Sequence, residues 1–101
     1  MLSHQAWLIC KVSPGQFSEE YAINAMDHNG AEFSLFVSKS NVEHCCGEIE
    51  EGDECEGRIR VTVLKEEHPL ALIRLPGRTF ANGSTVTVKS DRLEAIETSQ
   101  T

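Results

Sequence analysis

Three short segments in the second half of the chain alternate apolar and polar side chains with a period of two residues, over 58–65, 70–75 and 85–89. This period is that of a half-buried β-strand, because successive side chains point to opposite faces of the sheet. Residues typical of turns separate the segments, so we predict a β-meander. The side chains predicted to face the interior are Ile59, Val61, Val63, Ile73, Leu75, Val86 and Val88.

The first half of the chain predicts three further strands, over 7–12, 21–27 and 31–37. The last two flank a turn at 28–30. A two-residue turn would mix polar and apolar side chains on both faces, whereas a three-residue turn with Gly30 in the left-handed region separates them. We therefore predict the three-residue turn. The cross-strand pairs would be Tyr21 with Val37, Ile23 with Leu35, and Ala25 with Phe33.

Short helical turns are predicted where cap spacings follow a strand. Ser40 and Glu43 have the spacing of a capping box, as do Asp91 and Glu94. Pro76-Gly77 and Asn82-Gly83 are turn signals, and we expect them to separate the last two strands. The acidic segment 48–56 is expected to be a solvated loop, and 97–101 a frayed tail.

The predicted fold class is all-β with one or two short helical turns, built as a small six-stranded antiparallel barrel or barrel-like sheet. Residues 1–101 are expected to form one domain, because a chain of this length supports one modest core. Two topologies are open. Three strands, a short helix and a long strand after Gly52 follow the element order of an OB fold. Alternatively, the similar segments 37–43 and 88–94 indicate two related halves with approximate two-fold symmetry. The general preference of Ser, Asn and Asp for caps also explains that similarity by chance, and we favour chance.

The net charge of −7 is unevenly distributed: residues 1–57 carry −9 and residues 58–101 carry +2. An acidic protein is repelled by nucleic acid and by anionic membranes at long range, so the charge disfavours both partners. No basic segment precedes the short apolar run 6–10, which predicts a cytoplasmic protein without a membrane span.

The four cysteines are expected to be reduced, as in most cytosolic proteins, and Cys10 to lie in the core. His44, Cys46 and Cys55 are the candidates for a metal site. Cys45 and Cys46 are adjacent, whereas zinc sites separate paired cysteines by two to four residues, so we expect neither a metal nor another cofactor. Catalytic motifs are not evident, and we expect no enzymatic activity.

The most suggestive surface is the outer face of the last three strands, where leucines and arginines share one side. An apolar patch with a charged rim is typical of a contact surface. We predict a non-catalytic module that binds a protein partner or a second copy of itself. Nucleic-acid binding by an OB-like arginine face is the alternative, and zinc binding is the third possibility. The predicted contact residues are Arg58, Arg60, Leu64, Leu70, Leu72, Arg74 and Arg78.

Overall fold

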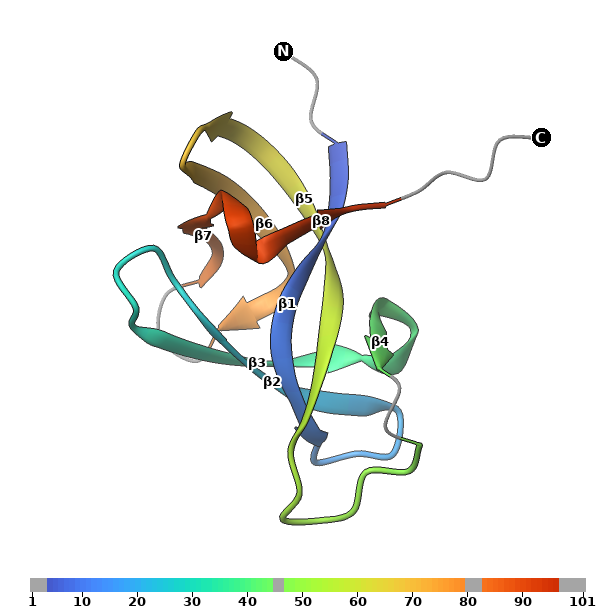
Figure 1. Ribbon diagram of the computed structural model, residues 1–101. Coiled ribbons are helices and arrows are strands. Elements are labelled where there is room, and N and C mark those ends of the chain that lie inside the picture. Colours follow the sequence, from blue (N-terminus) through green and yellow to red (C-terminus); the bar gives the residue numbers. More distant parts are fainter. Residues whose placement is uncertain (1–3, 45–46, 80–82, 97–101) are drawn as a thin grey trace, which may run out of the picture.

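The structure, a computed structural model, describes residues 4–44, 47–79 and 83–96 (Figure 1). It is an all-β fold, as predicted: six long antiparallel strands form a strongly curled half-barrel sheet with two 3₁₀ turns. β1 and β5 run side by side as the central ribbon of this sheet. The six strands are β1 (His4–Pro14), β2 (Glu20–Met26), β3 (Glu32–Ser38), β5 (Cys55–Glu67), β6 (Leu70–Thr79) and β7 (Gly83–Lys89).

The β2–β3 hairpin has the predicted three-residue turn, and all three predicted cross-strand pairs are confirmed. The Asp27 backbone N–H donates to the Ala31 carbonyl at 2.8 Å, which closes the turn around 28–30. The Asp27 carboxylate accepts hydrogen bonds from the Asn29 and Ala31 backbone N–H groups, and Gly30 has φ of 82°. The register of this hairpin therefore follows from turn chemistry and polarity together.

Each predicted helical turn is a single 3₁₀ turn that leads into a short strand. η1 (Lys39–Asn41) precedes β4 (Val42–His44), and η2 (Ser90–Arg92) precedes β8 (Leu93–Ala95). The predicted capping boxes are wrong, because residues that would continue a helix instead pair with β5 and β1 and gain ladder hydrogen bonds there. The cap of η1 is Ser38, whose Oγ accepts from the Ser40 N–H.

The predicted strand break at Pro76-Gly77 is also wrong, because β6 continues through it to Thr79. The pairing of β6 with β7 is irregular between Arg74 and Thr79, so proline, which cannot donate to the ladder, lies where the ladder is already interrupted. A Cβ at Gly77 would approach the Phe36 carbonyl oxygen to 3.1 Å, and glycine permits this close passage of β6 beside β3.

The two halves of the chain are related by approximate two-fold symmetry. η1 and η2, β4 and β8, and β3 and β7 each begin 51 residues apart. Leu8 pairs with Ile59 at the centre of the ribbon, and the same two residues pair outward with Leu93 and Val42, respectively. The similar segments 37–43 and 88–94 therefore occupy equivalent positions in the two halves, which favours two related halves over the explanation by chance.

The core lies between the β1–β5 ribbon and the two hairpins that fold over its inner face. The predicted inward positions are confirmed, with Val86 half-buried and the others at most 4% exposed. Cys10 also belongs to this core, as predicted. None of the described residues forms a helix long and apolar enough to cross a membrane. Fully buried large side chains are Leu8, Ile23, Leu35, Ile59, Ile73, Val12, Val61, Val63 and Val88.

Candidate functional site

The predicted contact leucines lie on the outer face where β5 turns into β6. Leu70 is 36% and Leu72 37% exposed, and Leu64 is half-buried. A register irregularity between Val63 and Lys65 shapes this surface. Strict alternation would turn Lys65 inward with Val63, but the extra residue lets it face water directly across from Leu72.

Lysine and glutamate side chains border the leucines and form a shallow groove with them. The groove has a volume of about 180 Å³. Lys65 pairs across the sheet with Leu72, and Lys89 pairs with Leu70. Glu67 forms an ion pair of 3.4 Å with Lys65. We call this surface the leucine groove; its lining residues are Lys65, Glu67, Leu70, Ala71, Leu72 and Thr87.

Of the predicted arginines, Arg58 and Arg60 lie away from the leucine groove, and Arg74 lies beside it. Arg58 and Arg60 lie near the middle of the central ribbon, whereas Glu67 and Leu70 lie at its end. At about 3.3 Å per residue, Arg60 and Glu67 are separated by roughly 23 Å along β5. Arg74 faces outward in β6, opposite Thr62 and one outward position from Leu72. Arg78 lies within β6, and its side chain is outside the described part of the structure.

Arg58 is the centre of an ion-pair cluster that ties both short strands to the ribbon. Its Nη2 donates to Glu43 Oε1 at 2.6 Å, and its Nη1 donates to Glu94 Oε1 at 2.6 Å. The guanidinium carbon lies 4.7 Å from the Trp7 ring centroid, and that of Arg60 lies 5.3 Å from it. The hydrogen bonds to Glu43 and Glu94 raise the Arg58 pKa. Two carboxylates thus neutralise the charge of Arg58.

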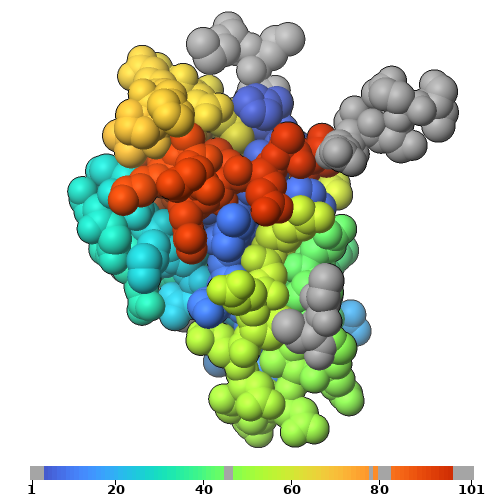
Figure 2. All heavy atoms as spheres, viewed as in Figure 1, coloured from blue at the N-terminus to red at the C-terminus, as the bar shows by residue number. Residues whose placement is uncertain are grey.

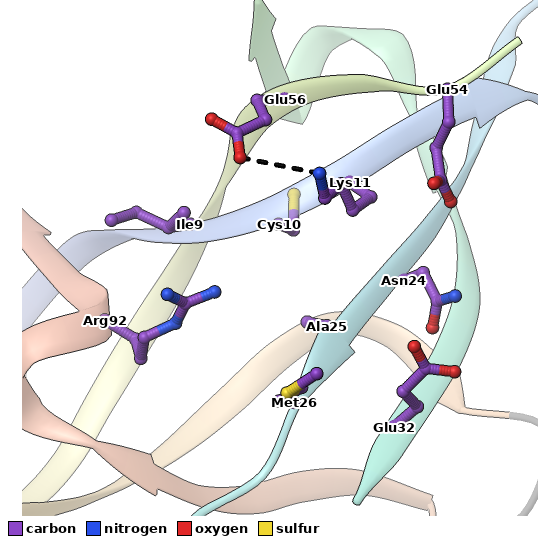
Figure 3. A pocket seen from close by; sticks show the side chains of 10 residues that line it. All are labelled: Ile9, Cys10, Lys11, Asn24, Ala25, Met26, Glu32, Glu54, Glu56 and Arg92. Atoms are coloured by element: carbon purple, nitrogen blue, oxygen red, sulfur yellow. Dashed lines mark hydrogen bonds and ion pairs between the residues drawn. The ribbon is translucent and has the colours of Figure 1, made fainter. Parts of the chain in front are cut away.

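A small pocket opens where the pairing of β1 with β2 stops after Lys11 and Asn24 (Figure 3). Arg92, from η2, reaches over it from one side. The wall includes Cys10, a free thiol that is 3% exposed. Burial raises the Cys10 pKa to about 12, with a smaller opposing effect of Arg92. A thiol this hard to ionise is a poor nucleophile at neutral pH.

We expect Cys10 to react with iodoacetamide only when the chain unfolds, because a rise in its pKa from 9.0 to about 12 makes the thiolate roughly 1000-fold rarer below pH 9. The same shift predicts that stability falls between pH 9 and about 12, where the unfolded chain has lost the proton and the folded chain still holds it. The loss is at most about 1.4 kcal/mol per pH unit. Peptide-resolved mass spectrometry measures the labelling, and urea titrations of wild type and Cys10→Ala measure the stability. Labelling as fast as in urea would contradict the prediction.

The candidate metal ligands are already engaged where the structure describes them. His44 Nε2 lies 3.0 Å from the Tyr21 hydroxyl. Cys55 is disulfide-bonded, which corrects our expectation of a free thiol there. His44 pairs with Gly57, so the fold holds β4 only two residues from Cys55, a proximity that sequence spacing did not indicate. Cys45 and Cys46 lie outside the described residues. The described ranges hold no group of three potential His, Cys, Asp or Glu ligands.

An exposed aromatic residue that we did not single out from the sequence lies in the β1–β2 turn. Phe17 is 71% exposed. The Glu20 carboxylate accepts hydrogen bonds from the Gln16 and Phe17 backbone N–H groups, and the Glu20 N–H donates to the Phe17 carbonyl at 3.2 Å. A Cβ at Gly15 would lie 2.7 Å from Glu20 Cγ, so glycine permits this tight turn. The signal available in the sequence was a single aromatic residue in a polar segment without strand alternation.

Comparisons with known proteins give no match: neither a family model, nor a curated protein, nor a solved structure is significantly similar to this chain.

Proposed function

We propose that this chain is a non-catalytic interaction module that binds protein through the leucine groove on the outer face of β5, β6 and β7. The observation that carries the proposal is the exposure of Leu70 and Leu72, each more than a third accessible, side by side on one strand. Exposed leucines bordered by charged side chains are typical of surfaces that become covered on association. The half-buried Leu64 precedes Lys65 in β5 and is not among the residues that line the groove.

A second copy of the chain is the simplest partner. The outer face around the leucines carries Lys65, Lys89 and Arg74 against Glu67, while the first half of the chain is strongly acidic. Opposite charges on different parts of one molecule favour association between copies, and this attraction weakens as salt is added. We place this module in the cytoplasm, as the sequence predicts. The disulfide of Cys55 argues against that location, because disulfides form mainly in oxidising compartments, and fractionation of cells tests it.

We expect concentration-dependent self-association in 20 mM salt that weakens by a factor of ten or more in 500 mM salt, because the contact is small and charge-assisted. Leu72→Glu is expected to abolish it by placing a carboxylate on the apolar surface. Sedimentation velocity at 0.05–1 mM measures both effects, and circular dichroism checks the fold of the variant. Met26→Ala, which removes a side chain 47% exposed elsewhere, is the control. A wild-type monomer at 1 mM and low salt would refute self-association.

Nucleic-acid binding by the arginine face is the competing function. The ion pairs of Arg58 argue against this function. Glu43 and Glu94 neutralise its guanidinium, which therefore attracts phosphate groups only weakly. Fluorescence anisotropy with labelled single-stranded RNA tests it directly. Binding that falls in both Arg60→Ala and Arg74→Ala, with a shallower salt dependence, would favour the nucleic-acid function over the one proposed.

A further inference from the structure

A second exposed apolar side chain, Phe17, lies in the β1–β2 turn, at the other end of the central ribbon from the leucine groove. The turn between β1 and β2, which carries Phe17, lies at the lower end of Figure 1, and the turn between β5 and β6 lies at the upper end. The approximate two-fold symmetry exchanges these two ends of the central ribbon, because β1 and β5 run antiparallel about the pair of Leu8 and Ile59. The two ends that the symmetry exchanges therefore differ. One end carries the exposed ring of Phe17, and the other carries the leucine groove.

The charges of the two ends are also opposite. The loop at 51–54 lies beside 13–15, so Glu51, Asp53 and Glu54 adjoin the turn that carries Phe17, and Glu19 is exposed in that turn. Figure 2 shows this yellow-green loop and the golden β5–β6 turn at opposite ends of the molecule.

The leucine end is basic on its outer face. That face carries Lys89 and Arg74 in addition to Lys65, which forms an ion pair with Glu67, while Glu66 pairs with the buried Ala71 and belongs to the other face. Long-range attraction between unlike ends favours a head-to-tail orientation and opposes contact between two like ends.

The backbone of Phe17 is held by its turn. The Phe17 N–H donates to the Glu20 carboxylate and the Phe17 carbonyl accepts from the Glu20 N–H, while the side chain is 71% exposed. An exposed aromatic side chain on an ordered backbone suits an interface anchor, because only its own rotamers have to be ordered on binding. The groove around Leu70 and Leu72 has a volume of about 180 Å³, enough to receive one aromatic ring.

From these observations we infer that Phe17 of one copy inserts into the leucine groove of the next, and that the acidic turn of the first copy meets Lys65 and Lys89 of the second. This inference depends on the proposed function and names the segment that occupies the groove. A contact between two different surfaces is heterologous, and repeating it adds copies head to tail instead of closing a symmetric dimer. The assembly is therefore an open chain or a closed ring of copies, and it forms more readily as concentration rises.

Two single variants and their mixture test the inference. Phe17→Ala keeps the groove, and Leu72→Glu keeps the ring; each alone is expected to sediment as a monomer at a concentration where the wild type forms chains. An equimolar mixture of the two is expected to form a 1:1 dimer and nothing larger, because only one intact ring and one intact groove can meet. Met26→Ala should form chains like the wild type. If circular dichroism shows that the Leu72→Glu variant has lost its fold, the Leu70→Ala variant is used in its place.

The possible outcomes separate this inference from the proposed function. If Phe17→Ala associates within threefold of the wild-type Kd while Leu72→Glu is monomeric, the groove is the contact surface and Phe17 is not its occupant. If the wild type stops at a dimer at 1 mM, the contact is symmetric and the head-to-tail arrangement is wrong. If both variants associate like the wild type, the inference and the proposed function both fail.

Discussion

Replacing Ile59 by alanine is expected to lower the free energy of unfolding by about 3–4 kcal/mol. Ile59 is 0% exposed and lies at the centre of the two-fold arrangement, paired with Leu8 on one side and with Val42 on the other. The substitution removes three buried carbon atoms and leaves a cavity between β-strands that cannot collapse, because both neighbouring strands are held by their ladders. Urea denaturation followed by circular dichroism measures the change.

Leu72→Ala is the matched control for Ile59→Ala. It removes an aliphatic side chain of the same size from a residue that is 37% exposed, and we expect it to cost about 1 kcal/mol or less. Leu8→Ala, at the symmetry-related position, is expected to cost about as much as Ile59→Ala, since Leu8 is 1% exposed. A loss below about 1 kcal/mol at Ile59 would contradict the central position of this pair in the core.

Gly57→Ala is expected to destabilise the fold by about 1–3 kcal/mol and to loosen β4 selectively. A Cβ at this position would lie 2.7 Å from the Glu43 carbonyl oxygen, 2.8 Å from Val12 Cγ2 and 3.1 Å from His44 Cβ. Two of these neighbours belong to β4, which must move away from β5 to make room. Hydrogen exchange should therefore increase at Glu43 and His44 more than elsewhere in the sheet.

The symmetry-related position supplies the comparison for Gly57→Ala. Ala6 lies 51 residues earlier in β1, carries a Cβ and pairs with Ala95 in β8, whereas Gly57 pairs with His44 in β4. The double variant Gly57→Ala with Val12→Ala removes the nearest side-chain obstacle but leaves the Glu43 carbonyl and His44 Cβ in place, so it should not restore the exchange protection of β4. Unchanged exchange in Gly57→Ala would show that β4 is not held this close to β5.

Most of the long strands could be predicted because their signal is local. The alternation in 58–65 and 85–89 identifies both a strand and its buried face within a few residues, and the structure confirms it. The β2–β3 register was predictable as well, since one choice of turn separates polar from apolar side chains and the other does not. The 3₁₀ turns were predictable in place, but not the short strands after them, because β4 and β8 exist only through pairing with distant residues.

The candidate site was predictable only in part, for the same physical reason. Exposure of Leu70 and Leu72 follows from alternation along β6. The pairing of Arg58 with Glu43 and Glu94 does not, because the three residues come from three strands and meet only after the ribbon and both short strands have assembled. The disulfide of Cys55 could not be predicted either, because the spacing of the cysteines in the sequence indicated neither a disulfide partner nor a set of metal ligands.

The amino-acid sequence by itself determined the all-β class, the positions of the long strands and the side of each that is buried. These properties depend on the two-residue period of a strand and on turn residues close in sequence. Only the tertiary structure decided the two-fold relation between the halves, the neutralisation of Arg58 and the location of Phe17 and the leucine groove at opposite ends. Each of these depends on which strands lie side by side, and that is set by packing between segments about half a chain apart.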